Sequence, residues 1–134
     1  MKTLLNSLIL CSLFNLPLYS AEYTWLHNYD EALTLAKKQK KDIYLFIGAD
    51  ICIFCEKYKK NTLSKLEVMQ RLNKDYIPVY LSRDQDFIAK SFETTGVPRH
   101  YFIDYSGAIF FDTQGFLEVD GFYTMLDEAE LSKE

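Results

Sequence analysis

The sequence has few of the residues that mark non-globular chains. Its 134 residues include only 5 glycines and 3 prolines, while 49% are hydrophobic and 25% are charged. These proportions exclude collagen-like, disordered and coiled-coil chains. Ten tyrosines and ten phenylalanines supply enough apolar surface for one core, and the length is too short for a second. We therefore expect a single globular domain.

Positive charge is also scarce. Lysine and arginine number 15 against 19 acidic residues, which gives a net charge of −4 and a pI near 5.2. A nucleic-acid or anionic-membrane partner would require a basic face, so we exclude nucleic acid as a partner. The densest basic run, 37–41, lies in a segment with helical periodicity and is interpreted as solvated surface.

The first twenty residues have the layout of a secretory signal peptide. Lys2 is followed by an apolar stretch over 4–18, with small residues at Ser20 and Ala21. A membrane span needs about 20 apolar residues, so a permanent anchor is disfavoured, and the leucine before Cys11 disfavours lipidation. We expect residues 1–20 to be a signal peptide, residues 21–134 to be the mature domain, and the protein to be periplasmic.

Cysteine is rare, and its placement is informative. Of three cysteines, Cys11 belongs to the leader, which leaves only Cys52 and Cys55 in the mature domain. An exported protein has left the reducing cytosol, so its thiols can be oxidised and remain so. The pair is therefore the first candidate for chemistry.

Capping signals and apolar spacing predict several helices. Asn28 with Glu31, and Ser64 with Glu67, have the spacing of capping boxes. Apolar side chains recurring every three or four residues predict helices over about 29–40, from Ser64 through Leu72, over 84–93 and over 121–131. A further helix is expected to begin at the cysteine pair.

Strands are expected between these helices. The apolar run 42–48 fits a buried strand, and 76–82 fits an edge strand because Pro78 lacks the N–H that a ladder requires. Segments 100–104 and 108–112 flank the turn at 105–107 and predict a hairpin. The order indicates an α/β fold with a central mixed sheet of about four strands, flanked by helices on both faces.

The strongest motif is C-x-x-C, placed directly after a buried strand and at the start of a helix. The free N–H groups and positive dipole of a helix start stabilise a thiolate, lowering its pKa from about 8.5 toward about 7 or below. We therefore assign Cys52 as the nucleophile. Cys55 lies on the same helical face and can attack a mixed disulfide formed at Cys52, which makes it the resolving thiol.

With strand 43–47, the residues 48–50, this cysteine pair and Gly96-Val97-Pro98 before another strand, the chain resembles the thioredoxin superfamily, and within it secreted bacterial thioredoxin-like domains. The resemblance covers about residues 25–131. It implies a cis peptide bond before Pro98, packing of Pro98 against the cysteines, and pairing of the Val97 backbone with a bound substrate strand. No cofactor is implied.

Two positions depart from the pattern of the superfamily. Ile51 stands where tryptophan is usual, and Phe46 stands where a buried acid is common. Between the cysteines, Ile53 and Phe54 offer no cation or hydrogen bond that would stabilise a thiolate and raise the reduction potential. This favours a reductase or isomerase over an oxidase. With Val97, these apolar side chains would form a lip suited to extended polypeptides.

Other interpretations of the cysteines stay open. A disulfide with only a structural role is one, although so short a loop constrains the unfolded chain little. A zinc site would need His27 and His100 as the remaining ligands, and covalent haem attachment would need a histidine where Glu56 stands. His100 is interpreted as a packed or surface histidine, and Trp25 as a core or interface anchor.

The sequence thus predicts an exported thiol:disulfide oxidoreductase with Cys52 and Cys55 as catalytic residues. Val97, Pro98, Ile53 and Phe54 are the expected substrate-binding residues. Partners would be disulfide-containing proteins and a membrane electron carrier that reduces the pair again. The alternatives are an oxidase of the same fold and a non-enzymatic domain that binds a client through its apolar lip.

Overall fold

The computed structural model describes residues 23–133, and the predicted signal peptide lies outside them. The elements in chain order are α1 (Tyr29–Gln39), β1 (Asp42–Gly48), α2 (Ile53–Tyr58), the π-helical turn η1 (Lys59–Leu63), α3 (Leu66–Asp75), β2 (Tyr76–Ser82), β3 (Arg99–Ile103), β4 (Ile109–Gln114) and α4 (Val119–Leu131). Within the described part of the chain, no helix is long and apolar enough to cross a membrane.

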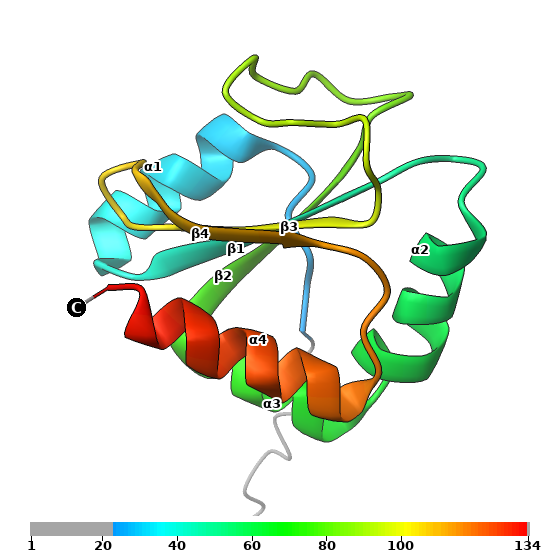
Figure 1. The fold of residues 1–134 in the computed structure, drawn as a ribbon. Coiled ribbons are helices and arrows are strands. Elements are labelled where there is room, and N and C mark those ends of the chain that lie inside the picture. The colour runs from blue at the N-terminus through cyan, green and yellow to red at the C-terminus, as the bar shows by residue number, and fades with distance from the viewer. Residues whose placement is uncertain (1–22, 134) are drawn as a thin grey trace, which may run out of the picture.

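The four strands form one mixed sheet in the order β2-β1-β3-β4. β1 and β2 are parallel, whereas β3 runs antiparallel to both β1 and β4. In Figure 1, α1 lies over one face of the sheet, and α3 and α4 lie over the other. The predicted mixed sheet, its parallel pair and its hairpin are confirmed.

β1 is the centre of the core, and all seven of its residues are buried. Because side chains alternate along a strand, Tyr44 and Phe46 pack with α3 and α4, while Ile43, Leu45 and Ile47 pack with α1. Burial on both faces explains why the strand reads as a continuous apolar run rather than an alternating one.

β2 lies at the sheet edge, as Pro78 predicted. The chain before α1 covers this edge: the amide of Leu26 donates to the carbonyl of Pro78 at 3.0 Å, and the amide of Tyr80 donates to the carbonyl of Leu26 at 2.9 Å. Pro78 has no N–H to donate toward this edge. The covering segment uses only the carbonyl of Pro78, as an acceptor.

The predicted helix over 84–93 is wrong, because residues 83–98 form a long loop on the α1 side of the sheet (Figure 1). The Ser82 carbonyl accepts the amides of both Gln85 and Asp86, and the Asp86 carboxylate accepts the Ser82 amide at 2.7 Å. Such side-chain bonds compete with helix formation. Phe92 is buried against Tyr29, so apolar packing is satisfied without a helix.

The predicted capping box of Ser64 and Glu67 is also wrong. α3 is preceded by Lys65, which makes no side-chain capping bond, and the Ser64 hydroxyl donates instead to the carbonyl of Lys60. Ser64 belongs to the end of the preceding helical segment, so its side chain serves that segment. The capping bond of Asn28, which accepts the amide of Glu31 at 3.0 Å, is confirmed.

Candidate active site

Cys52 and Cys55 open α2 and are joined by a disulfide, with their Cα atoms 5.2 Å apart. Cys52 is the N-cap residue: its backbone is extended, its carbonyl accepts the amide of Glu56 at 3.1 Å, and its sulfur accepts the amide of Cys55 at 3.1 Å. The pair therefore lies at the start of a helix, where backbone donors point toward the sulfur of Cys52.

The two cysteines differ in accessibility. Cys55 is completely buried, whereas Cys52 is half-buried. Thiol–disulfide exchange requires an in-line approach of one sulfur to another, so a partner protein can reach Cys52 more easily than Cys55. This asymmetry fits the two roles that the sequence assigns.

Large apolar side chains surround the pair at the surface. Ile51 is 97% exposed, Ile53 67% and Phe54 53%. Exposed aliphatic and aromatic side chains this close together on a small domain are unusual unless they contact something else. Of the four side chains expected to form the apolar lip, these three are exposed, whereas Val97 is half-buried.

Val97 and Pro98 precede β3, and the peptide bond between them is cis. Val97 is half-buried and packs against the same hydrophobic cluster as Cys52, a cluster of which Cys55 is a member. Pro98 is buried, and its carbonyl accepts the amide of Gly115 at 2.8 Å. The structure thus brings Cys52, Cys55 and Val97 to one cluster, and the packing of Pro98 against the cysteines stays a prediction.

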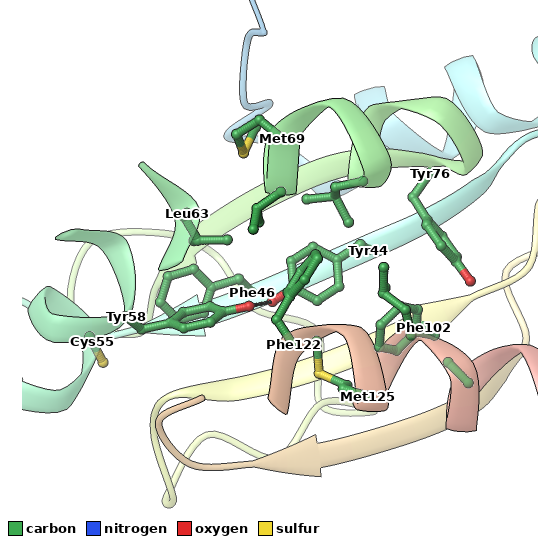
Figure 2. Close-up of a cluster of buried hydrophobic side chains, with 14 residues drawn as sticks. Tyr44, Phe46, Cys55, Tyr58, Leu63, Met69, Tyr76, Phe102, Phe122 and Met125 are labelled. Atoms are coloured by element: carbon green, nitrogen blue, oxygen red, sulfur yellow. Dashed lines mark hydrogen bonds between the residues drawn. The ribbon is translucent and has the colours of Figure 1, made fainter. Parts of the chain in front are cut away.

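A hydrogen-bonded chain of three buried side chains lies in the core beyond Cys55. The hydroxyl groups of Tyr58 and Tyr44 are 2.8 Å apart and point toward each other, as Figure 2 shows. The Tyr44 hydroxyl is also 2.8 Å from Nδ1 of His100, whose Nε2 is 2.9 Å from the carbonyl of Gly115. Because a carbonyl only accepts, Nε2 donates, Nδ1 accepts from Tyr44, and Tyr44 accepts from Tyr58.

This chain is electrically neutral. Burial lowers the pKa of His100 to about 4, against a smaller opposing effect of its bond to Gly115, and burial raises the pKa of both tyrosines. The rings of Phe46 and His100 are stacked with centroids 5.8 Å apart. Where the superfamily commonly has a buried acid, this protein has an apolar ring above an uncharged histidine. His100 is a packed histidine, as expected.

The zinc interpretation gains no support from the positions of the histidines. Both ring nitrogens of His100 are already engaged in the buried chain, and Nδ1 of the exposed His27 lies 3.1 Å from the carbonyl of Tyr80, to which it donates. Among residues 23–133, no three His, Cys, Asp or Glu side chains cluster in a way that could hold a metal ion.

Sequence reasoning missed the residues that anchor the loop before Cys52. The Asp50 carboxylate accepts from the Ser82 hydroxyl and from the Gln85 amide, each at 2.7 Å. The backbone amide of Asp50 donates to the Asp84 carboxylate at 2.8 Å. The bond from Gln85, followed by that from Ser82, lowers the pKa of Asp50. The only sequence signal was a polar cluster after a strand, which we interpreted as a helix.

Comparison with curated proteins finds distant relatives. An uncharacterised protein of Archaeoglobus fulgidus is 36% identical over 55 residues, which cover 41% of this chain and 43% of that protein. Anterior gradient protein 3 of Mus musculus is 27% identical over 94 residues, covering 70% of this chain and 57% of that protein. The chain therefore spans about half the length of the curated relatives it matches.

Solved structures share the fold. The DsbH oxidoreductase aligns over 96% of this chain and 93% of its own, with a TM-score of 0.68 and 20% identity. The oxidised C-terminal domain of Neisseria meningitidis DsbD aligns over 79% of this chain and 99% of its own, with a TM-score of 0.65 and 19% identity. At these identities the likeness establishes the fold.

Family assignment comes from the sequence match. Residues 24–104 match the family described as thioredoxin-like, a range that runs from the segment covering the β2 edge to the end of β3 and includes both cysteines. The fold, the C-x-x-C pair at a helix start and this match agree: the chain belongs to the thioredoxin-like family and has the thioredoxin-like fold.

Proposed function

We propose that this protein is an exported thiol:disulfide oxidoreductase that reduces or isomerises disulfides of protein substrates. The observation that carries the proposal is the arrangement of the pair. Cys52 is half-buried at a helix start and its sulfur accepts a backbone amide, while Cys55 is buried behind it. An inert disulfide requires neither the helix start nor the difference in accessibility.

The reaction begins with the reduced pair. The Cys52 thiolate attacks one sulfur of a substrate disulfide, a mixed disulfide forms, and the other substrate sulfur leaves as a thiolate. Cys55 then loses its proton and attacks the Cys52 sulfur, which closes the Cys52–Cys55 disulfide and releases the second substrate thiolate. The substrate gains two electrons, and the released thiolates take up protons from Cys55 and water.

The reducing direction is supported by what surrounds the Cys52 sulfur. Its hydrogen-bond donor is the Cys55 amide, and within residues 23–133 no side chain donates to it. Ile53 and Phe54 add only apolar surface. A strongly oxidising pair requires a reduced form that is stabilised well beyond this.

The substrate class follows from the surface around the pair. The apolar lip suits unfolded or extended polypeptide, and Ile53 and Phe54 would contact its side chains. The Val97 backbone, which lies at the same hydrophobic cluster as the cysteines, would pair with the substrate main chain, as a strand pairs at an open edge.

Export is part of the proposal. The N-terminal pattern supports a signal peptide over residues 1–20 and a periplasmic domain over 21–134. A reductase working in an oxidising compartment must receive electrons from elsewhere, so a membrane electron carrier is its proposed redox partner.

Insulin reduction tests the activity. With a chemical dithiol as donor, the wild-type protein should accelerate insulin reduction, Cys52→Ser should abolish this, and Cys55→Ser should accumulate a mixed disulfide with insulin. Undiminished activity of Cys52→Ser would eliminate the mechanism.

The exposed apolar lip favours one other function, which is client binding. That function predicts capture of unfolded polypeptide that survives replacement of both cysteines.

A further inference from the structure

The loop before Cys52 is tied to the end of β2. Asp50 receives bonds from Ser82 and Gln85 and donates its amide to Asp84, all between 2.7 and 2.8 Å. The Arg83 amide donates to the Gly48 carbonyl at 3.0 Å and so extends the contact of β1 with β2 by one step. Residues 48–50 are therefore held to the segment 82–85 by both main-chain and side-chain bonds.

The same segment also holds the approach to Val97. Nη1 of Arg83 donates to the carbonyls of Thr94 and Thr95, at 2.9 and 3.3 Å. These carbonyls are two and three residues before Val97. Arg83 thereby joins the two ends of the loop 83–98.

A local turn keeps these carbonyls in place. The Glu93 carboxylate accepts the amides of Thr94 and Thr95, each at 3.1 Å, and the Thr95 hydroxyl at 2.7 Å. The Tyr101 hydroxyl on β3 accepts the Glu93 amide at 2.6 Å and donates to the Glu93 carbonyl at 3.1 Å. The guanidinium of Arg83 therefore binds an ordered turn that is itself attached to the sheet.

From these contacts we infer that residues 82–85 form a brace that fixes the Val97–Pro98 loop relative to Cys52, with Arg83 as its positioning residue for protein substrates. One arm, from Ser82, Asp84 and Gln85, holds the cysteine loop. The other arm, from Arg83, holds the turn before Val97. This inference rests on the proposed function, because it requires Cys52 to be the nucleophile and Val97 to bind the substrate strand. Residues 82–85 then set the distance between the two.

The brace has a consequence that depends on substrate size. A protein disulfide must be held along the Val97 backbone while its sulfur meets Cys52, so its rate depends on the relative position of the two loops. A small disulfide needs only Cys52. Loosening the Arg83 arm should therefore slow protein substrates and leave small disulfides unaffected, whereas simple loss of folding would slow both.

The test compares insulin with dithiodipyridine, a small uncharged disulfide, in the full-length protein. Arg83→Ala should lower kcat/KM for insulin by roughly tenfold, mainly through kcat, and leave the rate with dithiodipyridine unchanged. Arg83→Lys, which keeps a cationic donor, should recover most of the loss. Lys90→Ala is the matched control: it removes one cation from the same loop, where Lys90 is exposed and makes no side-chain bond within residues 23–133. Arg83→Gln replaces Arg83→Ala if that variant does not fold.

The outcomes are distinguishable. A selective loss with insulin, recovered by lysine and absent in Lys90→Ala, supports the brace. Equal losses on both substrates, or no loss on either, overturn it while leaving the proposed function standing. A wild-type protein that is inert toward both disulfides overturns the proposed function, and the brace with it.

Discussion

At the scale of single residues, the distinctive feature is a buried histidine kept neutral in the core, where it packs against Tyr44 and Tyr58. His100 donates to the Gly115 carbonyl and accepts from Tyr44, so its neutral form satisfies both nitrogens. A proton on Nδ1 would give this buried chain one donor more than it has acceptors, whichever way the tyrosine hydroxyls turn. The side chains that replace the common buried acid of the superfamily therefore resist protonation instead of accepting it.

We expect stability to fall as the pH drops from 6.5 to about 4. The pKa of His100 is about 4 in the folded protein, against an ordinary value of 6.5. Between these values the unfolded chain binds a proton that the folded chain does not. The contribution of His100 is therefore complete above pH 6.5 and is lost as the pH falls toward 4, at a total cost of about 3 kcal/mol. Urea unfolding at a series of pH values measures this slope.

Two substitutions isolate the residue responsible. His100→Gln keeps a donor and an acceptor but does not titrate, so its free energy of unfolding should change much less between pH 6.5 and 4. His27→Gln makes the same replacement at an exposed histidine and serves as the matched control. Hydrogen bonds lower the pKa of Asp50, Glu93 and Asp104. These shifts reduce stability only as the pH falls below the ordinary carboxyl pKa values of 3.8 to 4.5. A wild-type curve that is flat above pH 4.5 would show that His100 is not a buried neutral base.

At the scale of elements, sequence patterns located the segments whose side chains are buried in a regular pattern. The strand 42–48 was predicted with its observed bounds because burial on both faces leaves a continuous apolar run. The segment 84–93 was mistaken for a helix because its apolar spacing was real, but its polar groups form turn bonds to Ser82 and its other contacts are to distant segments. Arg83, Asp86 and Phe92 find partners in a neighbouring turn, the end of β2 and α1. One sequence does not reveal such partners.

The two capping-box patterns provide a test at this scale, since only one forms. Asn28→Ala removes the side chain that caps α1 and should lower the free energy of unfolding by about 1 kcal/mol. Ser64→Ala removes a hydroxyl that only bonds back to the Lys60 carbonyl and should change it by less than about 0.5 kcal/mol. Urea unfolding of both variants at neutral pH decides the matter. Equal losses would mean that Ser64 caps α3 after all.

At the scale of the whole molecule, the position of the cysteine pair was easier to predict than the long-range contacts in the core and around the loop before it. Cys52 and Cys55 are three residues apart, so their place at a helix start follows from local sequence alone. The neutral chain of Tyr44, Tyr58 and His100 joins three elements that are distant in sequence, as does the anchoring of Asp50 by Ser82. Contacts of this kind depend on how the sheet brings segments together, which periodicity and spacing do not specify.

The direction of electron flow is a property of the whole molecule, and it is measured by the reduction potential. In the described part of the chain, the hydrogen-bond donor to the Cys52 sulfur is a backbone amide, and the neighbouring core is neutral, so the reduced form gains little beyond the helix start itself. We therefore expect a potential more negative than about −200 mV, in the range of reducing thioredoxin-like proteins. Equilibration with glutathione buffers, read by alkylation of free thiols, gives the value. A potential near about −120 mV, typical of a strong oxidant, would instead assign the protein to disulfide formation.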